Sequence, residues 1–548
     1  MKNIMIVPNA KIVNLELQSR YGKITPINIP LNNKIILDYL YEKYSNFYDE
    51  IVIIGYEDFE KVSNIIGTRN YSKIKLIKLD KLKDIGYSIY FALKNYNLSE
   101  IKSLSINFAD TLINNLKSEY LNRNIIFFNE VNESEKWTTF IIEKEDIKIN
   151  DKIEQISNKY NAFVGFFNFI NSKLFFKILE KNMGNSESLY LAIKDFYRKE
   201  KINFIKNNDW LDFGHLDNYF SGKNIVETRY FNHIDIDKSR GILFKSSEEK
   251  EKFINEVKWF LKLPEDLQWV TPRIYSYSLN WKKPFVKMEY YSYPTLHHMY
   301  LYGNYSINKW EHIFERLLEI QKEFSKYKLE DSKEKIKEAL NKIYLEKTIQ
   351  RLLELKKDIN FSKYFENDYK INAKECMSLM KIINILPKLI EKFKIYEIKN
   401  LQIIHGDYFF ANILYEPNYN IVKLIDPRGD FGGYGIYGDK YYELAKLSHS
   451  IDGMYDFIVE DMFELEEKEL DFNYTIKCEN KYFLIKDVFY KNFNNEEKIK
   501  IKFIQALLFL SMIPLHKDKP KRQKIMLGVG MRLLNEVING EDFSGSAR

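Results

Sequence analysis

The sequence predicts two parts of different fold class. Over residues 1–222, short apolar runs alternate with segments of helical pattern, which is typical of an α/β fold with a mostly parallel sheet. Residues 223–305 carry a predicted hairpin and a further strand, and residues 306–548 carry apolar residues mostly at helical spacing. We therefore expect an α/β part followed by an α+β part that divides into a strand-rich and a helical segment.

Composition excludes some classes of partner. The 83 Lys and Arg against 77 Asp and Glu give a net charge of +6, which is small for 548 residues and does not favour nucleic acid. Cys376 and Cys478 have no metal-ligand neighbours at short spacing, which favours a reducing compartment. The N-terminal apolar run is too short for a signal peptide, and Phe503–Ile513 is too short to span a bilayer. These patterns predict a cytoplasmic protein without membrane insertion, and they leave its oligomeric state open.

In the first part, strands and helices are expected in alternation. The strands are predicted at 4–7, 50–55, 74–79 and 104–108, and the helices at 35–48, 59–66 and around 88–94. Asp110 follows the fourth strand, and open sheets bind ligands beyond the carboxyl ends of their strands. Asp212 is placed similarly, and two such carboxylates can hold a divalent cation against nucleotide phosphates. The alternative is that each Asp is a helix cap.

Four short motifs carry a resemblance over roughly the first 220 residues. They are PLNNKIIL at Pro30–Leu37, FAD at Phe108–Asp110, NAFVG at Asn161–Gly165, and WLDFG at Trp210–Gly214 followed by His215 in place of Thr. Their order resembles that of the sugar-phosphate nucleotidyltransferases. The resemblance implies that Asp110 and Asp212 bind Mg²⁺, and that this part transfers a nucleotidylyl group from an NTP, CTP by analogy.

The phosphate-binding loop departs from that family. The family has a Gly-rich loop followed by Pro-Lys, whereas Pro8–Val13 contains no glycine and Pro26 is followed by Ile27. Glycines let backbone N–H groups approach phosphate closely. Without them, positive charge has to come from Lys11, Arg20 or Lys23. A working nucleotidyltransferase and a degenerate binding or scaffold domain both remain open.

The second part begins with a predicted hairpin, Thr228–Ile236 and Gly241–Lys245, followed by a helix over 247–261. A strand Lys followed by a helical Glu is the ion pair that positions ATP phosphates in kinase-like folds. Lys245 and Glu256 are the candidates for this pair. The alternative is a surface Lys and one of several helix acids. Helices are then predicted at 310–327, 332–357 and 376–393.

The segment Leu401–Gly433 contains the pattern that most clearly indicates a catalytic site. It predicts strands separated by turns, with Asp407, Asn412 and Asp426 at strand ends, in the order H-x-D-x-x-x-x-N and then Asp. Phosphoryl transfer needs a carboxylate that orients and deprotonates a hydroxyl, and oxygen ligands that hold Mg²⁺ on the phosphates. The alternative is a buried hairpin with polar caps.

His405-Gly406-Asp407 and Ile425-Asp426-Pro427 resemble the aminoglycoside phosphotransferase and choline kinase family, which phosphorylates hydroxyls of small molecules. The resemblance implies a bilobal kinase-like fold. It also implies Asp407 as catalytic base, Asn412 and Asp426 as Mg²⁺ ligands, and Met288, Glu289 and Tyr290 as the adenine-contacting strip.

Residues after Asp426 have smaller expected roles. The resemblance implies that Asp439 braces the catalytic loop, and Glu443 stands where the family has a second Asp. Arg428 either faces phosphate oxygens or pairs with Asp430, and His449 is expected to be a buried, hydrogen-bonded side chain. Closing helices are predicted at 503–513 and 524–538.

Together these motifs predict a bifunctional enzyme. The C-terminal part would phosphorylate a small alcohol, polyol or sugar with ATP, and the N-terminal part would join the product to a nucleoside monophosphate. The pairing resembles fused enzymes of capsule and surface-glycan precursor synthesis. Two rivals remain: a kinase whose N-terminal part only binds, and a regulatory protein with both sites inactive.

Overall fold

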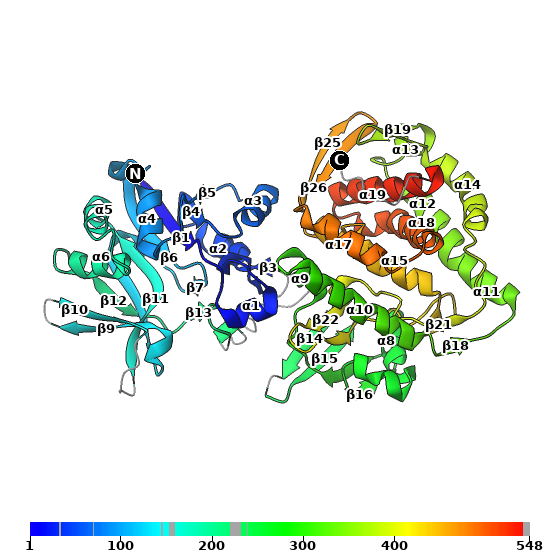
Figure 1. Ribbon diagram of the computed structural model, residues 1–548, viewed down its shortest axis with the longest axis horizontal. Helices are drawn as coiled ribbons and strands as arrows, with labels where there is room; N and C mark the ends of the chain where they lie inside the picture. Colours follow the sequence, from blue (N-terminus) through cyan, green and yellow to red (C-terminus); the bar gives the residue numbers. More distant parts are fainter. Residues whose placement is uncertain are drawn as a thin grey trace. The chain divides into compact units, whose positions relative to one another are not determined.

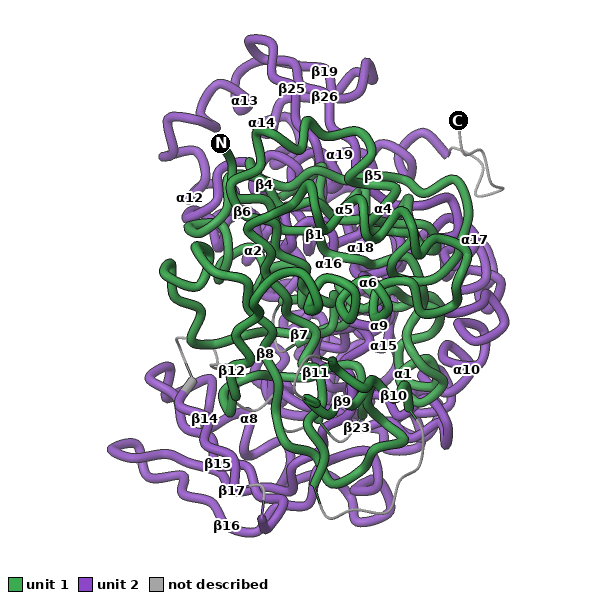
Figure 2. Tube along the Cα trace, turned by 90° about the vertical axis from the view of Figure 1, so that its left-hand side faces the viewer, with its two compact units in different colours: residues 1–227, 302–304 green, residues 228–301, 305–548 purple. Residues whose placement is uncertain are grey.

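The computed structural model describes residues 1–31, 34–69, 71–143, 146–152, 159–216, 218–219, 232–237 and 239–540 (Figure 1). The chain forms two compact units (Figure 2). Unit 1 is Met1–Glu227 with Tyr302–Asn304, and unit 2 is Thr228–Leu301 with Tyr305–Arg548. The boundary expected between 222 and 223 lies outside the described residues.

Unit 1 is built on a mixed sheet. Its described strands are β1 (Lys2–Asn9), β4 (Glu50–Gly55), β5 (Ile74–Lys78), β6 (Ile101–Asn107), β8 (Ile125–Val131), β9 (Thr138–Glu143), β10 (Asp146–Asp151), β11 (Tyr160–Phe169) and β12 (Asn203–Lys206). The order is β10-β9-β11-β6-β1-β4-β5, with β8 on β11 and β12 on β8. Strands β5, β4, β1 and β6 are parallel, as predicted, whereas β11 runs antiparallel to β6, β8 and β9. On the other side of β6 the pairs are antiparallel, except that β12 is parallel to β8, so the sheet is mixed.

Helices cover this sheet because its strands are apolar on both faces. The described helices are α1 (Leu15–Tyr21), α2 (Ile36–Tyr44), α3 (Phe59–Thr68), α4 (Ile85–Leu93), α5 (Ser172–Lys181) and α6 (Ser188–Tyr197). Ile4 and Ile6 of β1 belong to a buried cluster with residues of α4, α5 and α6. Met5 and Val7, which alternate with them, are also fully buried. Polar side chains fix helix starts: Asn14 caps α1 and Asp84 caps α4.

Unit 2 begins with an antiparallel sheet in the order β14-β15-β17-β16. The strands are β14 (Asn232–Asp237), β15 (Ile242–Ser247), β16 (Ile274–Ser278) and β17 (Phe285–Glu289), and helix α8 (Lys250–Lys262) follows β15. The predicted hairpin is confirmed where the chain is described, with Ile234 opposite Lys245. Residues 228–231 and 238 of that prediction lie outside the described part.

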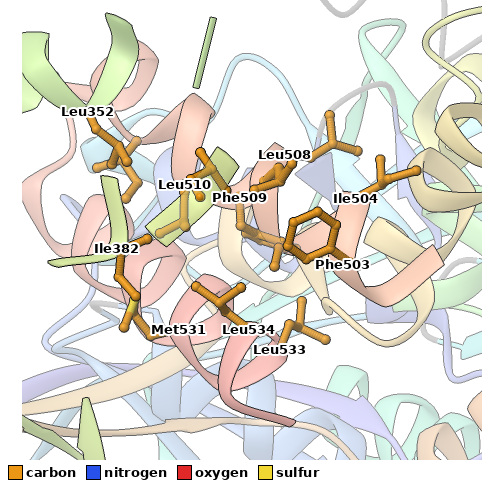
Figure 3. Close-up of a cluster of buried hydrophobic side chains, with 14 of the residues drawn as sticks. Leu352, Ile382, Phe503, Ile504, Leu508, Phe509, Leu510, Met531, Leu533 and Leu534 are labelled. Atoms are coloured by element: carbon orange, nitrogen blue, oxygen red, sulfur yellow. The ribbon is translucent and has the colours of Figure 1, made fainter. Parts of the chain in front are cut away.

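The rest of unit 2 is mainly helical. Its helices are α9 (Leu296–Leu301), α10 (Ile307–Phe324), α11 (Lys333–Leu340), the π-helix η6 (Asn341–Glu346), α12 (Lys347–Leu355), α13 (Lys363–Glu366), α14 (Leu379–Lys392), α15 (Lys440–Ile451), α16 (Tyr455–Val459), α17 (Lys481–Tyr490), α18 (Asn495–Met512) and α19 (Pro520–Asn539). Their core joins Leu352 of α12, Ile382 of α14, and apolar side chains of α18 and α19 (Figure 3). This core is separate from that of unit 1.

Short strands complete unit 2. They are β18 (Lys328–Leu329), β19 (Tyr369–Ile371), β20 (Lys374–Cys376), β21 (Leu401–Ile403), β22 (Ile413–Glu416), β23 (Ile421–Leu424), β24 (Tyr437–Gly438), β25 (Phe463–Lys468) and β26 (Asp471–Ile476). The helix predicted from Cys376 begins at Leu379 instead, because the Ser378 side chain caps it and Cys376 pairs within a hairpin.

The long apolar run is a buried helix, as predicted, but it is longer than predicted. Phe503–Ile513 lies mostly in α18, and among the described helices Asn495–His516 is long and apolar enough to cross a membrane. Inside the protein, 72% of its apolar window is buried. Cys376 and Cys478 are free thiols.

Candidate functional sites

The two predicted carboxylates of unit 1 lie side by side. Strand β7 (Thr111–Ile113) pairs with β13 (Trp210–Asp212), and this pairing sets Thr111 opposite Asp212. The turn before β7 is held by the Asn107 side chain, which donates to the backbone oxygens of Phe108 at 2.7 Å and Thr111 at 2.9 Å. Asp110 and Asp212 therefore meet at the carboxyl end of β6.

Gly214 makes this close arrangement possible. A Cβ at position 214 would lie 2.5 Å from Asp110 Oδ2 and 3.3 Å from Asp212 Oδ1. The Gly214 N–H also donates to Asp212 Oδ1 at 3.1 Å. The residue after it, His215, brings Nδ1 to 2.8 Å from Asp212 Oδ2. Any side chain at 214 would push the carboxylates out of place.

The charges of this pair fit a divalent cation. Burial, and then the charge of Asp212, raise the pKa of Asp110 to about 6. The hydrogen bond to Asp212 raises the pKa of His215. Among the described residues, no group of three or more His, Cys, Asp or Glu side chains could hold a metal alone. Two carboxylates are nevertheless a suitable donor set, because Mg²⁺ is usually completed by water and substrate phosphates.

Two adjoining cavities open on Asp110. One has a volume of about 330 Å³ and is lined by Pro26, Lys83 and Ser88, among others. The other has a volume of about 410 Å³ and is lined by Trp137, Tyr190 and Asp212, among others. Asp110 and His215 line both cavities. The two cavities therefore share one wall, which includes Asp110.

The cations at these cavities differ in part from those predicted. Lys11 lines both, as does Lys152, and Lys83 lines the smaller one. Arg20 and Lys23 are not among the described residues that line either cavity. Lys83 follows the end of β5. The expectation that ligands bind beyond the carboxyl ends of the strands, which indicated Asp110, therefore also indicates Lys83. Lys152 follows an antiparallel strand, and the sequence carries no signal for it.

In unit 2, Lys245 of β15 joins helix α8, which follows it in the chain, to a distant segment after β23. Its Nζ lies 2.7 Å from Glu256 Oε1 of α8 and 2.7 Å from Asp426 Oδ1, which follows β23. Lys245 is only 4% exposed. Burial raises the pKa of Glu256 to about 7, although the charge of Lys245 opposes this. The predicted ion pair between Lys245 and Glu256 is present, and Lys245 also contacts Asp426, which was predicted as a metal ligand.

The turn that carries Asp407 is fixed by a buried carboxylate. Glu443 of α15 accepts the backbone N–H groups of His405 and Gly406, each at 2.9 Å. The His405 ring nitrogen Nε2 lies 3.0 Å from the backbone oxygen of Ile425. Asp439, which was expected to brace this loop, instead caps α15 and accepts the hydroxyl of Tyr344 at 2.6 Å. Glu443 therefore has the bracing role expected of Asp439.

Asp407 and the two proposed ligands lie close together. Asn412 Nδ2 donates to the backbone oxygen of Asp407 at 3.0 Å and to that of Asp426 at 3.5 Å. This orientation leaves Asn412 Oδ1 as an acceptor for a metal ion beside the Asp426 carboxylate. Burial would raise the pKa of Asp407, but Lys446 at 2.9 Å and Arg428 hold it below its usual value. Asp407 is therefore ionised at neutral pH.

The predicted adenine strip is largely used by the sheet. Met288 is buried opposite Leu243. The Glu289 N–H donates to the Arg273 backbone oxygen at 2.9 Å, and the Tyr290 N–H donates to that of Gly241 at 2.8 Å. These two N–H groups are therefore not open to a nucleobase.

Two further expectations change in detail. Arg428 does contact Asp430, but through the backbone: its Nε donates to the Asp430 backbone oxygen at 3.1 Å, and its Nη1 donates to the Tyr442 hydroxyl at 2.7 Å. His449 is buried as expected, yet neither ring nitrogen has a hydrogen-bond partner among the described residues. Its ring packs against those of Tyr455 and Phe509, with the ring centroids 4.3 Å apart in each case.

No family model matches the chain. Its N-terminal part is similar to several solved structures. HddC from Yersinia pseudotuberculosis, complexed with GMP-PN, is 17% identical over 41% of this chain and 100% of that one, with a TM-score of 0.34. A putative glucose-1-phosphate thymidylyltransferase from Bacillus anthracis is 15% identical over 41% and 98%, with a TM-score of 0.34. The inositol-1-phosphate CTP transferase from T. maritima is 14% identical over 40% and 95%, with a TM-score of 0.33. At these values, the functional assignment has to come from the residues themselves.

Proposed function

We propose that the protein is a bifunctional transferase. Unit 2 moves the γ-phosphoryl group of ATP to a hydroxyl of a small molecule. Unit 1 then joins the phosphorylated product to a nucleoside monophosphate from an NTP, with CTP as the first candidate, and releases pyrophosphate. The resemblance to fused enzymes of capsule and surface-glycan synthesis points to an activated precursor for a surface polysaccharide.

One observation carries the kinase half: Lys245 lies 2.7 Å from both Glu256 and Asp426, although Asp426 is 181 residues further along the chain than Lys245. This arrangement suits a lysine that is aimed by Glu256 at ATP phosphates, next to a carboxylate that receives Mg²⁺. Asn412 and Asp426 would hold the ion, which when bound would neutralise phosphate charge.

The transfer step assigned to unit 2 uses Asp407 as base. Its carboxylate orients the acceptor hydroxyl and takes the proton as the hydroxyl oxygen bonds to the γ-phosphorus. The bond from that phosphorus to the bridging oxygen breaks, and ADP leaves with the electron pair. Lys446, 2.9 Å from Asp407 Oδ1, keeps the carboxylate ionised and in position.

The step assigned to unit 1 is also a displacement at phosphorus. A phosphate oxygen of the acceptor attacks the α-phosphorus of the NTP. The bond from the α-phosphorus to the oxygen that bridges it to the β-phosphorus breaks, and pyrophosphate leaves with the electron pair. The smaller cavity suits the nucleotide, since Lys11, Lys83 and Lys152 supply positive charge where glycines are missing. Asp110 and Asp212 would hold Mg²⁺, which when bound would offset charge on the phosphates.

A coupled assay tests both halves. ADP formation is measured with ATP and a panel of alcohols, polyols and hydroxy acids, and pyrophosphate release is then measured with each NTP and the phosphorylated products. ADP formation followed by pyrophosphate release supports the bifunctional enzyme. ADP formation without pyrophosphate release from any NTP would leave a kinase with a binding domain, which the glycine-free segment Pro8–Val13 favours. If neither ADP nor pyrophosphate forms, both proposed activities are contradicted.

A further inference from the structure

Unit 2 contains a cavity that lies outside the phosphotransfer site. Its volume is about 410 Å³, and its walls are the end of α8, the 3₁₀-helix η5 (Glu265–Val270) with the chain that follows it, and strands β16, β17 and β23. Lys245, Glu256 and Asp426 are not among the described residues that line it, and neither is any residue of the turn 405–412. The lining residues that matter here are Phe260, Arg273, Tyr275, Tyr277, Glu289 and Lys423.

We propose that this cavity binds a nucleoside 5′-phosphate as an effector, separately from the ATP that unit 2 turns over, and that its binding weakens the affinity of unit 2 for ATP. The ligand chemistry is a flat aromatic base joined to phosphate. Free nucleotides and the nucleotide-linked product proposed for unit 1 share this chemistry. The effect on ATP rests on the phosphotransferase function proposed above, whereas the binding does not.

Two tyrosines supply flat surfaces for a base. Tyr275 and Tyr277 of β16 are 47% and 49% exposed. Within the described ranges, neither hydroxyl has a hydrogen bond and neither ring has an aromatic neighbour. The pairing of β16 with β17 shifts register at Tyr275, which makes it the extra residue of a β-bulge. Bulges redirect side chains and are frequent next to functional sites. Exposed aromatic rings stack on any nucleobase.

Two cations supply the charge for phosphate. The Arg273 guanidinium has neither a hydrogen bond nor an ion pair in the described part of the chain, and its backbone oxygen accepts the Glu289 N–H at 2.9 Å. Lys423 Nζ donates to the backbone oxygens of Trp269 at 2.8 Å and Thr271 at 3.0 Å, and an ammonium group has a third N–H. Glu289 is the one acid among the described lining residues, so the cavity carries a net positive charge.

Together these features select the class of ligand. The cavity volume lies within the range of about 300–1,000 Å³ that is usual for small-molecule sites. An uncharged sugar would cover the tyrosine rings but leave the Arg273 guanidinium without an anion. An inorganic anion would pair with Arg273 but leave the rings exposed. A nucleotide satisfies both, since its base stacks and its phosphate binds guanidinium.

The walls of the cavity also carry the residues assigned to ATP. Phe260 lines it from α8, one helical turn after Glu256, and both side chains are buried. Lys423 lines it from β23, three residues before Asp426, and ties this strand to the backbone at and after η5. A phosphate that competes for the Lys423 N–H groups would loosen this tie. The segment that places Asp426 would then be held less firmly, and ATP would bind more weakly.

Equilibrium dialysis on the intact protein tests the binding. CTP, CDP, ADP and CDP-glycerol, the last as a model of a nucleotide-linked product, are titrated against the wild type and Lys245→Met. We expect Lys245→Met to retain a site that Arg273→Ala or Tyr277→Ser weakens at least about tenfold. Tighter binding of CDP-glycerol than of CDP would identify the product as the effector, and the reverse would identify the free nucleotide.

Matched controls come from exposed turns of the same unit. Arg240→Ala, between β14 and β15, and Tyr419→Ser, between β22 and β23, lie outside the described cavity lining and should bind as the wild type does. Binding that Arg273→Ala and Tyr277→Ser leave unchanged would overturn the proposal. So would loss of the Arg273-dependent site in Lys245→Met, because the nucleotide would then occupy the ATP site.

Steady-state kinetics test the effect on ATP. The KM for ATP in ADP formation should rise at least about fivefold with saturating CDP or CDP-glycerol, and Arg273→Ala should remove this rise while keeping the KM measured without effector. A rise that persists in Arg273→Ala would show competition at the ATP site and overturn the regulatory effect, as would an unchanged KM. Absence of any ADP formation would contradict the phosphotransferase instead, and the dialysis result would be unaffected.

Discussion

At the residue scale, Gly214 sets the spacing of the carboxylates in unit 1. A Cβ added at Gly214 would lie within 3.3 Å of both the Asp110 and the Asp212 carboxylates. The β7–β13 pairing holds the backbone next to both residues in place. The glycine is thus required by the space beside it, whereas elsewhere in unit 1 a glycine such as Gly67 has open space around its Cα.

Gly214→Ala should therefore abolish most of the pyrophosphate release. A Cβ only 2.5 Å from Asp110 Oδ2 has to displace that carboxylate, and a shift of about 1 Å at a reacting centre costs roughly 100-fold in rate. Pyrophosphate release is measured at saturating NTP. Gly67→Ala, in α3, is the matched control, since nothing lies within 4 Å of the added methyl group. Equal rates in both variants would remove Asp110 from the reaction.

Asp407→Asn should lower ADP formation by about 10²- to 10⁴-fold, because an amide cannot accept the hydroxyl proton. Pyrophosphate release from a phosphorylated acceptor supplied directly should not change, because Asp407 belongs to unit 2. The two rates are measured on the same preparation. Unaltered ADP formation would show that Asp407 is not the base.

Residues within one short motif could be found from the sequence alone. Asp407, Asn412 and Asp426 lie within one short stretch of chain, and the spacing of their polar groups is itself the signal. Lys446 gave no such signal, because tertiary packing of α15 brings it to Asp407. The same holds for Lys152 in unit 1.

At the scale of elements, α9 and α16 are joined by a buried ion pair. His297 Nδ1 lies 2.6 Å from Asp456 Oδ1, and its Nε2 lies 3.7 Å from Glu460 Oε1. Burial alone would lower the pKa of His297, but these two carboxylates raise it from 6.5 to about 9. The protonated imidazole therefore stabilises the contact between the two helices.

This pair predicts a pH dependence of stability. Because the pKa is raised in the folded state, the stabilisation is fully present below pH 6.5 and is lost as the pH rises through 9. The free energy of unfolding of the wild type should fall by up to about 3 kcal/mol more than that of His297→Gln over this range. Urea unfolding at pH 6.5 and 9.5 measures the difference. If the free energy of unfolding falls equally in the wild type and in His297→Gln, then His297 is uncharged in the folded protein.

The sequence predicted the long helices α10, α18 and α19 and the parallel strands β1, β4, β5 and β6, because apolar spacing indicates which face of an element is covered. It did not predict helices α5 and α6 or strands β8 and β9. It did not predict the hairpins β19–β20 and β25–β26. Strand β25 has the sequence FELEEK, whose charged residues favour no strand, and it forms by pairing with β26. The sequence pattern gave no direction for β11, so the antiparallel pairs within the mostly parallel sheet were not predicted.

At the scale of the whole molecule, each unit has a buried hydrophobic cluster of its own among the described residues. Apolar alternation indicated this division from the sequence. The apolar pattern did not show that the chain returns to unit 1 after unit 2 has begun. Tyr302–Asn304 belong to unit 1, although the residues on both sides of them belong to unit 2.

Separate cores predict separate responses to ligands. Mg²⁺–ATP at about 100 times its Kd should stabilise unit 2 by about 2.7 kcal/mol. Lys245→Met should lose this stabilisation but keep that given by the NTP of unit 1. Thermal unfolding with each nucleotide measures both effects. If Lys245→Met responds to ATP as the wild type does, Lys245 does not contact the phosphates.

The double contact of Lys245 has a kinetic consequence under the proposed function. While its ammonium group is 2.7 Å from Asp426 Oδ1, that oxygen is neutralised and shielded from a free divalent ion. Nucleotide phosphates, by drawing the lysine away, would uncover the oxygen at the moment the ion is needed. Metal and nucleotide would then arrive as one complex, and the resting enzyme would be insensitive to changes in free magnesium.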